Sequence, residues 1–190
     1  MTKPLSFLEQ SAVDVAPQLL GCILERTIND KVIRVRIVEV EAYAQQDAAS
    51  HSFKGETPRT ATLFGPSGHL YVYFTYGMHY CCNVVTGAQG VGEAVLIRAV
   101  EPIDGEDIMM TLRHKTGVQL SNGPAKTCQA LGIDATLDGH DLVSTPLVLR
   151  QPSNPLRFDI IQTTRIGITK NSEYRWRFYI KNNPYVSHPI

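Results

Sequence analysis

The 190-residue chain lacks both a net charge and a long apolar segment. Its 18 basic residues equal its 18 acidic ones, whereas a protein that binds nucleic acid strongly usually has a basic excess. No apolar run reaches the roughly 18 residues of a membrane-spanning helix, and residues 1–4 lack the apolar core of a secretory signal. We therefore expect an intracellular protein that makes no contact with a membrane.

Cysteine is scarce, and its spacing fits neither a disulfide framework nor a zinc site. The chain has four cysteines, Cys22, Cys81, Cys82 and Cys128, and no C-x-x-C pair. We predict buried free thiols in a reducing compartment and no bound metal. The sequence also has no P-loop, no nucleophile elbow and no His-Glu-x-x-His motif, which argues against a nucleotide cofactor and against serine-type covalent catalysis.

Charge is distributed unevenly along the chain. Residues 1–110 contain 8 basic and 13 acidic residues, whereas residues 111–190 contain 10 and 5. The second segment could therefore supply a basic surface for a polyanionic partner, although the chain as a whole is neutral.

The sequence predicts one domain, residues 1–190, because it has no repeat and no long linker. Strands that neighbour one another in sequence, with helices at the ends, predict a mixed, mainly antiparallel α+β fold. Asn29 and Asp30 suit a tight hairpin turn, and we expect Asp14 to cap a helix that ends at Gly21. Further helices are predicted at residues 105–114 and 124–131, and strands at residues 22–28, 31–43, 69–75, 79–86, 93–99, 164–169 and 175–181.

The predicted strand at residues 31–43 carries two carboxylates. Because side chains alternate along a strand, Glu39, Glu41 and Tyr43 share a face with the apolar residues at positions 33, 35 and 37. Carboxylates two strand positions apart lie about 7 Å from each other, a spacing that glycosidic-bond hydrolysis by two carboxylates can use. The alternative is a strand that leaves the core, with both glutamates as solvated charges at its rim.

Tyrosine is concentrated between residues 71 and 80. Alternation places Tyr71, Tyr73 and Thr75 on one face of a strand, and the apolar residues 70, 72 and 74 on the face toward the core. Tyr76 and Met78 flank a glycine at the following bend, where a large side chain suits a wedge between stacked bases. An ordinary structural role is the alternative, because many sheets are rich in aromatic residues.

Two other features have a functional and an ordinary interpretation. His51 lies in a loop of small and polar residues, where a solvated histidine is the default and metal binding lacks a second ligand. In the predicted strand at 175–181, Arg175, Arg177, Tyr179 and Lys181 share a face. This basic face could follow a phosphate backbone, or it could simply be solvated.

Several segments together resemble the alkyladenine (3-methyladenine) DNA glycosylase family. They occur in the family's order and run from about residue 15 to the C-terminus, so the resemblance is far more specific than any single motif. The segments are residues 36–43 (RIVEVEAY), 49–52 (ASHS), 57–59 (TPR), 70–78 (LYVYFTYGM), 95–102 (VLIRAVEP), 123–131 (GPAKTCQAL) and 177–181 (RFYIK).

The resemblance implies a single domain with a curved antiparallel sheet, a protruding β-hairpin and peripheral helices, similar to the C-terminal domain of methionyl-tRNA formyltransferase. It implies a monomeric, monofunctional enzyme that flips a damaged purine out of double-stranded DNA and hydrolyses its N-glycosidic bond without metal or cofactor. The purines would be 3-methyladenine, 7-methylguanine, hypoxanthine and ethenoadenine. Such base-excision repair would take place in the cytoplasm or nucleoid of a bacterium, or in the nucleus of a eukaryote.

The matched motifs also imply roles in catalysis and DNA binding. Glu41 would be the general base that activates water, and Arg98 would be its partner in holding that water. Tyr76 would fill the space left by the flipped nucleotide, with Met78 beside it at the hairpin tip. Arg59 would contact the DNA.

The same resemblance implies which residues bind the flipped base. Tyr43, His51 and Tyr73 would be the walls of the base pocket, and Leu96 would also contact the base. Asn83 would obstruct the exocyclic amino group of normal guanine.

Two rival functions remain open. A non-catalytic nucleic-acid-binding module on the same fold would need neither Glu41 beside Arg98 nor a pocket lined by tyrosines. A hydrolase of small nucleosides would have no use for Tyr76 at an exposed tip.

Overall fold

The computed structural model describes residues 5–152 and 158–189. Residues 1–4, on which the expectation of a missing secretory signal depends, lie outside this range. Among the described residues, no helix is long and apolar enough to cross a membrane. The helices are α1 (Ala12–Leu19), α2 (Glu106–Arg113) and α3 (Pro124–Ala130), with short 3-10 helices η1 (Ser6–Glu9), η2 (Ala61–Phe64), η3 (Gly117–Leu120) and η4 (Ala135–Leu137).

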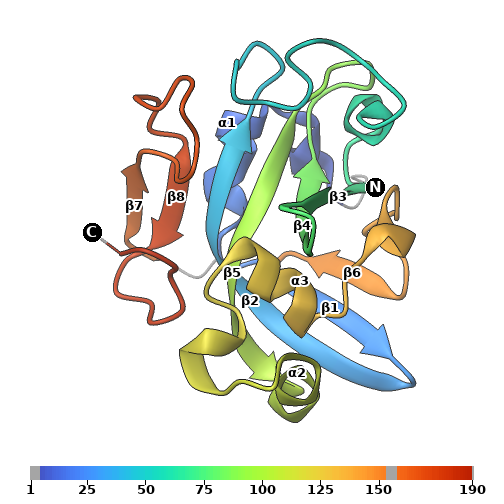
Figure 1. Ribbon diagram of the computed structural model, residues 1–190, viewed down its shortest axis with the longest axis vertical. Helices are drawn as coiled ribbons and strands as arrows, with labels where there is room; N and C mark the ends of the chain where they lie inside the picture. The colour runs from blue at the N-terminus through green and yellow to red at the C-terminus, as the bar shows by residue number, and fades with distance from the viewer. Residues whose placement is uncertain (1–4, 153–157, 190) are drawn as a thin grey trace.

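The strands of this part of the chain form one curved antiparallel sheet (Figure 1). They are β1 (Ile23–Ile28), β2 (Lys31–Tyr43), β3 (Leu70–Thr75), β4 (His79–Val85), β5 (Ala94–Asp104), β6 (Leu147–Arg150), β7 (Ile160–Thr163) and β8 (Arg177–Ile180). The order is β3-β4-β5-β2-β1-β6, and β8 pairs with both β2 and β7. The long central strand β2 therefore pairs with β1 along its first half and with β8 at Glu39–Glu41.

The alternation of side chains continues along the whole of β2. Its pairing with β5 shifts in register between Arg34 and Val35 and again on both sides of Glu39. Beyond Glu39 it returns to the register before that residue, with Ile37 opposite Val100 and Val40 opposite Ile97. The two glutamates and Tyr43 therefore share a face with the apolar residues 33, 35 and 37, as the sequence predicts.

Both faces of β2 are buried because helices cover them at different ends. Ile33, Val35 and Ile37 belong to the hydrophobic core, and so do Val38 and Val40 on the opposite face. In Figure 1, α1 lies behind β2 and β5, whereas α2 and α3 lie in front of the lower part of the sheet. The upper part of the front face is left for polar side chains.

The α+β architecture, the β1–β2 hairpin and the strands at 70–75, 79–85 and 177–180 confirm the sequence-based predictions. The hairpin turn at Asn29 and Asp30 has both residues in the left-handed region, with φ of 48° and 62°, as a tight primed turn requires. All four cysteines are buried free thiols, also as predicted.

Several predicted details were wrong. Ser11, not Asp14, caps α1, because its side chain accepts from the Asp14 N–H. The strand β6 was not predicted. The predicted strand at 164–169 is a loop, and the nearest strand, β7, ends before it at Thr163. Phe74 does not face the core: the hairpin extends beyond it, and Phe74 is 49% exposed and contacts the Tyr80 ring.

Candidate active site

Strand pairing alone brings side chains from four strands into one row on the front face of the sheet. Tyr71 on β3 lies opposite Asn83 on β4, which lies opposite Leu96 on β5, which lies opposite Glu41 on β2. Residues paired directly across antiparallel strands point to the same face. The row therefore joins chain positions that are up to 55 residues apart, from residue 41 to residue 96, at one place.

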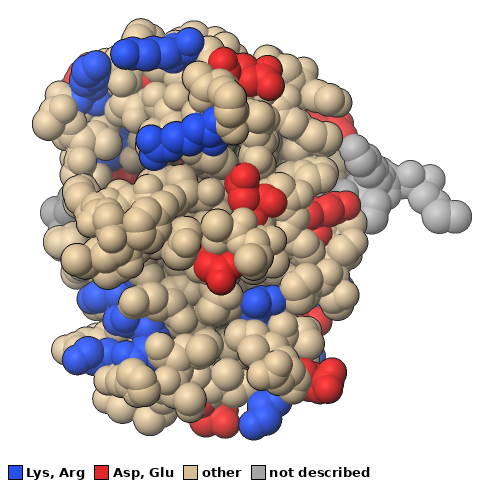
Figure 2. Space-filling model, turned by 45° about the vertical axis from the view of Figure 1, so that its right-hand side comes forward, with Lys and Arg blue, Asp and Glu red and all other residues tan. Residues whose placement is uncertain are grey.

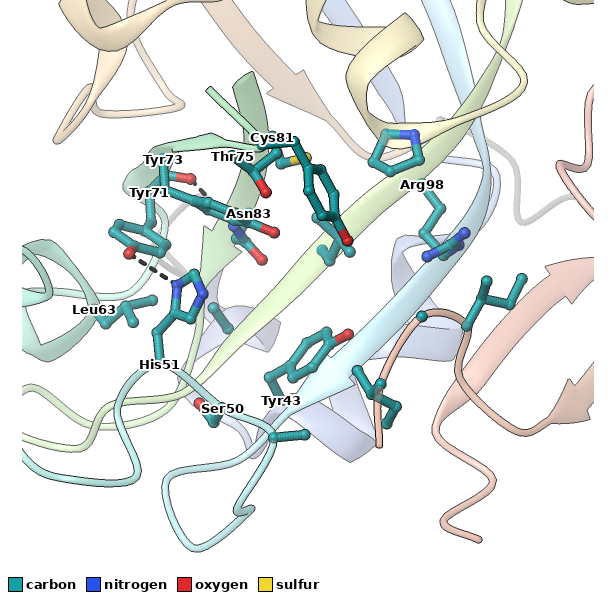
Figure 3. Close-up of a pocket in the computed structure, with 18 residues that line it drawn as sticks. Tyr43, Ser50, His51, Leu63, Tyr71, Tyr73, Thr75, Cys81, Asn83 and Arg98 are labelled. Atoms are coloured by element: carbon teal, nitrogen blue, oxygen red, sulfur yellow. Dashed lines mark hydrogen bonds between the residues drawn. The ribbon is translucent and has the colours of Figure 1, made fainter. Parts of the chain in front are cut away.

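A cavity of about 440 Å³ lies over this row (Figure 3). Tyr71, Tyr73 and His51 gather at one side of it, Arg98 lies at the other side, and Tyr43 lies between them. The lining comprises Tyr43, Ala49, Ser50, His51, Leu63, Tyr71, Tyr73, Thr75, Tyr76, Cys81, Asn83, Ala94, Leu96, Arg98, Pro124, Ile166, Gly167 and Ile168.

The carboxylate of Glu41 lies directly behind the lining. It is fully buried. Its Oε1 accepts from Arg98 Nη1 at 3.1 Å and from the Ile166 N–H at 2.8 Å, and its Oε2 accepts from the Tyr43 hydroxyl at 2.8 Å. Two of the groups that hold Glu41, the side chains of Tyr43 and Arg98, thus belong to the cavity lining.

Glu39 is also fully buried, and four donors satisfy it. Its Oε1 accepts from Arg98 Nε at 3.0 Å, from Arg177 Nε at 2.8 Å and from the Ser187 hydroxyl at 2.9 Å, and its Oε2 accepts from the Ser187 N–H at 2.6 Å. The alternative in which both glutamates are solvated rim charges is therefore wrong. Glu39 lies outside the cavity lining, and its contacts fix the position of Arg98.

The charges of this cluster stabilise one another. Burial alone would raise the pKa of Glu39, but Arg98, the Ser187 N–H and Arg177 outweigh burial and lower the pKa of this carboxyl. Burial opposes the charge of Arg98, yet Glu41 and Glu39 raise its pKa. Burial and the neighbouring Glu41 raise the pKa of the Tyr43 hydroxyl. Arg98 therefore stays charged, and Tyr43 remains a hydrogen-bond donor to Glu41.

The opposite side of the cavity is aromatic and uncharged. The ring centres of His51 and Tyr73 are 4.6 Å apart in an edge-to-face arrangement, and His51 Nδ1 lies 3.1 Å from the Tyr71 hydroxyl. The side chain of His51 is exposed at the loop, but partial burial of its ring and the nearby Arg59 lower its pKa. His51 is therefore neutral near neutral pH and does not repel a positively charged base.

The β3–β4 hairpin presents its tip to solvent beside the cavity. Tyr76 is 86% exposed and Met78 is 68% exposed. Tyr76 and Gly77 both have positive φ, 52° and 68°, which is unusual for a tyrosine. Arg59, a predicted DNA contact, is exposed and close enough to His51 and Tyr71 to influence their pKa values.

The structure corrects the prediction for the strand at 175–181. Arg177 and Tyr179 are buried, because β8 pairs with β2 and Arg177 binds Glu39. Only Arg175 and Lys181 remain exposed on the face that was predicted to be basic. The strand therefore supports the carboxylate cluster and presents no continuous basic surface.

Some lining residues were missed by the sequence analysis. Ile166, Gly167 and Ile168 come from a loop that was taken for a strand, and Cys81 was seen only as a thiol without partners. Burial raises the pKa of Cys81 to about 11, so its thiol stays protonated. Among the described residues, no group of three or more His, Cys, Asp or Glu is placed to hold a metal ion.

Sequence comparison shows to which protein family the chain belongs. Residues 6–184 match the model of the family described as methylpurine-DNA glycosylase (MPG). The chain belongs to the methylpurine-DNA glycosylase family. It is therefore an enzyme of DNA repair, a glycosylase that hydrolyses N-glycosyl bonds of damaged DNA.

Three relatives of this glycosylase cover almost its full length. A protein of Carboxydothermus hydrogenoformans is 50% identical over 98% of this chain and 99% of its own. One of Methanoculleus marisnigri is 49% identical over 98% and 99%, and one of Burkholderia lata is 46% identical over 98% and 91%. Each carries the name "Putative 3-methyladenine DNA glycosylase".

The contacts of Glu39 predict a large effect on the stability of this glycosylase. Glu39→Gln should lower the free energy of unfolding by about 3–5 kcal/mol, because it leaves Arg98 and Arg177 buried with one carboxylate fewer. Glu25→Gln, which removes a carboxylate from exposed ion pairs with Arg34 and Arg150, should cost no more than about 1 kcal/mol. Urea unfolding at pH 7 measures both.

Urea unfolding at acid pH tests whether the charge of Glu39 causes this stabilisation. Since the pKa of Glu39 is lower in the folded protein, its charge stabilises the fold above the unfolded pKa of about 4.3, and this contribution is lost as pH falls through the folded pKa. The difference between wild type and Glu39→Gln should therefore shrink in acid. Equal, small changes in the free energy of unfolding for Glu39→Gln and Glu25→Gln would contradict the stabilising role of the Glu39 charge.

Proposed function

We propose that this glycosylase flips alkylated or deaminated purines out of duplex DNA and hydrolyses the N-glycosidic bond with a water that Glu41 activates, leaving an abasic site. The observation that carries the proposal is the buried Glu41–Arg98 pair directly behind an aromatic cavity. The substrate class is alkylated and deaminated purines: 3-methyladenine, 7-methylguanine, hypoxanthine and ethenoadenine. The names of the relatives support the first of these.

The cavity suits a flipped base in size and chemistry. Its volume of about 440 Å³ lies within the range of about 300 to 1,000 Å³ that is typical of small-ligand sites. Tyr43, His51 and Tyr73 offer aromatic surfaces to a purine, and stacking compensates part of the cost of unstacking it from the duplex. A cationic alkylated purine gains a further cation–π attraction on a ring such as that of Tyr73.

Asn83 and Leu96 form the floor of the proposed base pocket. They lie opposite each other on β4 and β5 and are both buried. The Asn83 amide donates to the Tyr71 carbonyl oxygen at 3.3 Å, which fixes the orientation of its side chain. We assign to Asn83 the exclusion of normal guanine, whose exocyclic amino group would meet this held amide.

The reaction needs little more than a directed water. As the bond between sugar and base breaks, the base leaves with the electron pair and the sugar approaches an oxocarbenium ion. Water then bonds to the anomeric carbon, and its proton passes to Glu41. Oε2 of Glu41 accepts only from Tyr43 among the described residues, so it retains a lone pair for the water. Arg98, whose Nη1 lies 3.1 Å from Glu41 Oε1, holds the water beside this carboxylate.

The hairpin tip suits the space that a flipped nucleotide leaves in the duplex. Tyr76 and Met78 project from the domain with little of their own chain to pack against. A large side chain in this position keeps the flipped base from returning. On the face that Figure 2 shows, Lys and Arg lie in separate groups with acidic and uncharged side chains between them. Because the chain as a whole is neutral, we expect the wedge and the pocket to contribute more to the affinity for damaged DNA than its basic residues do.

Glu41→Gln tests the chemical step. It should lower single-turnover base release by about 10²–10⁴-fold, because an amide cannot take the proton of water, while binding to lesion-containing duplex stays nearly unchanged. Glu93→Gln is the matched control, since Glu93 is also buried but binds the Ala12 N–H at 2.8 Å. Base release by Glu41→Gln at the wild-type rate would refute the role of Glu41.

Tyr76→Ala tests the wedge. The free energy of unfolding should change by less than about 0.5 kcal/mol because the side chain is exposed. Release of hypoxanthine from duplex DNA should fall by about tenfold or more, since flipping costs a few kcal/mol, whereas release from single-stranded DNA should change little. Val143→Ala, at another exposed apolar residue, is the control. An equal loss on both substrates would argue against a wedge.

A further inference from the structure

A buried ion pair lies beneath the pocket residue Tyr43, and the reaction proposed above does not use it. The side chains of Arg165 and Asp47 are fully buried and form a direct ion pair. Arg165 also donates to the Ala42 carbonyl oxygen at 3.0 Å. Its guanidinium carbon lies 4.7 Å from the centre of the Tyr43 ring and 5.2 Å from that of Trp176. The guanidinium of Arg165 therefore lies over two aromatic rings.

The Tyr43 ring separates this guanidinium from the cavity. Tyr43 lines the cavity, whereas neither Arg165 nor Trp176 does. Arg165 Nε is buried without a hydrogen-bond partner among the described residues, whereas the other two nitrogens of the guanidinium donate to Asp47 and to the carbonyl oxygens of Ala42 and Asn171. A base that stacks on Tyr43 would lie on the other side of the ring from a fixed positive charge.

A charge in this position affects cationic and neutral bases differently. A cation bound to one face of an aromatic ring uses the same electron-rich π-system that a second cation on the other face would need. The two charges also repel each other, and water does not screen this repulsion in a buried site. A neutral purine on Tyr43 experiences neither the weakened cation–π attraction nor the repulsion. Asp47 makes the pair neutral overall, but the guanidinium is the member that covers the ring.

The Arg165–Asp47 pair also connects two parts of the pocket wall. A test of its charge must therefore distinguish the electrostatic effect from this structural role. Asp47 Oδ1 accepts from the Ala49 N–H at 3.0 Å and from Asn171 Nδ2 at 2.8 Å. Arg165 precedes Ile166, whose N–H binds Glu41 at 2.8 Å. A structural disturbance on loss of the pair would therefore lower the release rate of every base alike, whereas an effect of charge would change the ratio of the release rates of cationic and neutral bases.

We propose that the Arg165–Asp47 pair determines specificity, because its positive charge behind Tyr43 lowers the preference for cationic purines such as 7-methylguanine relative to neutral ones such as hypoxanthine. The inference rests on the proposed function. It means that Tyr43 serves as a stacking surface for the damaged base, and that cation–π attraction comes from the other side of the pocket, where Tyr73 lies (Figure 3).

Two variants test the charge in opposite directions. Asp47→Asn leaves the charge of Arg165 uncompensated, and the ratio of 7-methylguanine to hypoxanthine release should fall about threefold or more. The double variant Arg165→Met/Asp47→Asn removes both charges and keeps a long side chain under Tyr43, and the ratio should rise by about three- to tenfold. Single-turnover release is measured from the same duplex with either lesion, so the intrinsic lability of each base cancels in the comparison with wild type.

The control variant Arg36→Met/Glu101→Gln removes another ion pair of the same sheet, on the face of β2 away from the cavity, and should leave the ratio within about twofold. Ratios that stay constant in both test variants, or move in the same direction, would overturn the inference while the proposed function stands. If the double variant does not fold, the direction of change in Asp47→Asn decides alone. Wild-type protein that releases neither base would refute the proposed function itself.

Discussion

The guanidinium of Arg98 lies between the carboxylates of Glu39 and Glu41, and the need to keep these charges paired away from water constrains much of the chain. An unpaired ion in a protein interior is costly. Glu39 therefore requires β8 to pair with β2, so that Arg177 reaches it, and it requires Ser187 to close over it. Glu41 requires the loop after β7 to bring in the Ile166 N–H.

The same constraint explains how the molecule combines a rigid floor with an accessible pocket. Strand pairing sets the floor, because each member of the row from Tyr71 to Glu41 lies opposite its neighbour on the next strand. Loops supply the walls: the segment with His51 on one side, and Ile166–Ile168 on another. The hairpin adds Tyr76, the most exposed large hydrophobic side chain of the described residues. Groups that fix geometry are thus buried, and groups that would meet DNA are free to do so.

The sequence predicts those parts of the site that depend on alternation along a single strand. The shared face of Glu39, Glu41 and Tyr43, the face of Tyr71 and Tyr73, and the exposed Tyr76 all follow from local spacing. The partners of the carboxylates do not: Arg177 reaches Glu39 by strand pairing across 138 residues, and Ser187 reaches it from a loop 148 residues further along the chain. Arg165 also escaped prediction, since a strand-like stretch of sequence gives no sign that its side chain turns inward to bind Asp47. The family resemblance suggests the roles of the site residues, whereas the structure explains why the carboxylates of Glu39 and Glu41 are buried.

The most direct test of the account is a crystal structure of the Glu41→Gln variant on a duplex that contains one hypoxanthine. The account predicts an everted purine against Tyr43, with Tyr73 and His51 on its other side. It also predicts a water between residue 41 and the anomeric carbon, within hydrogen-bond distance of both residue 41 and Arg98. A purine that remains stacked in the duplex, or one that occupies the cavity while Tyr43 keeps every water away from residue 41, would contradict the account.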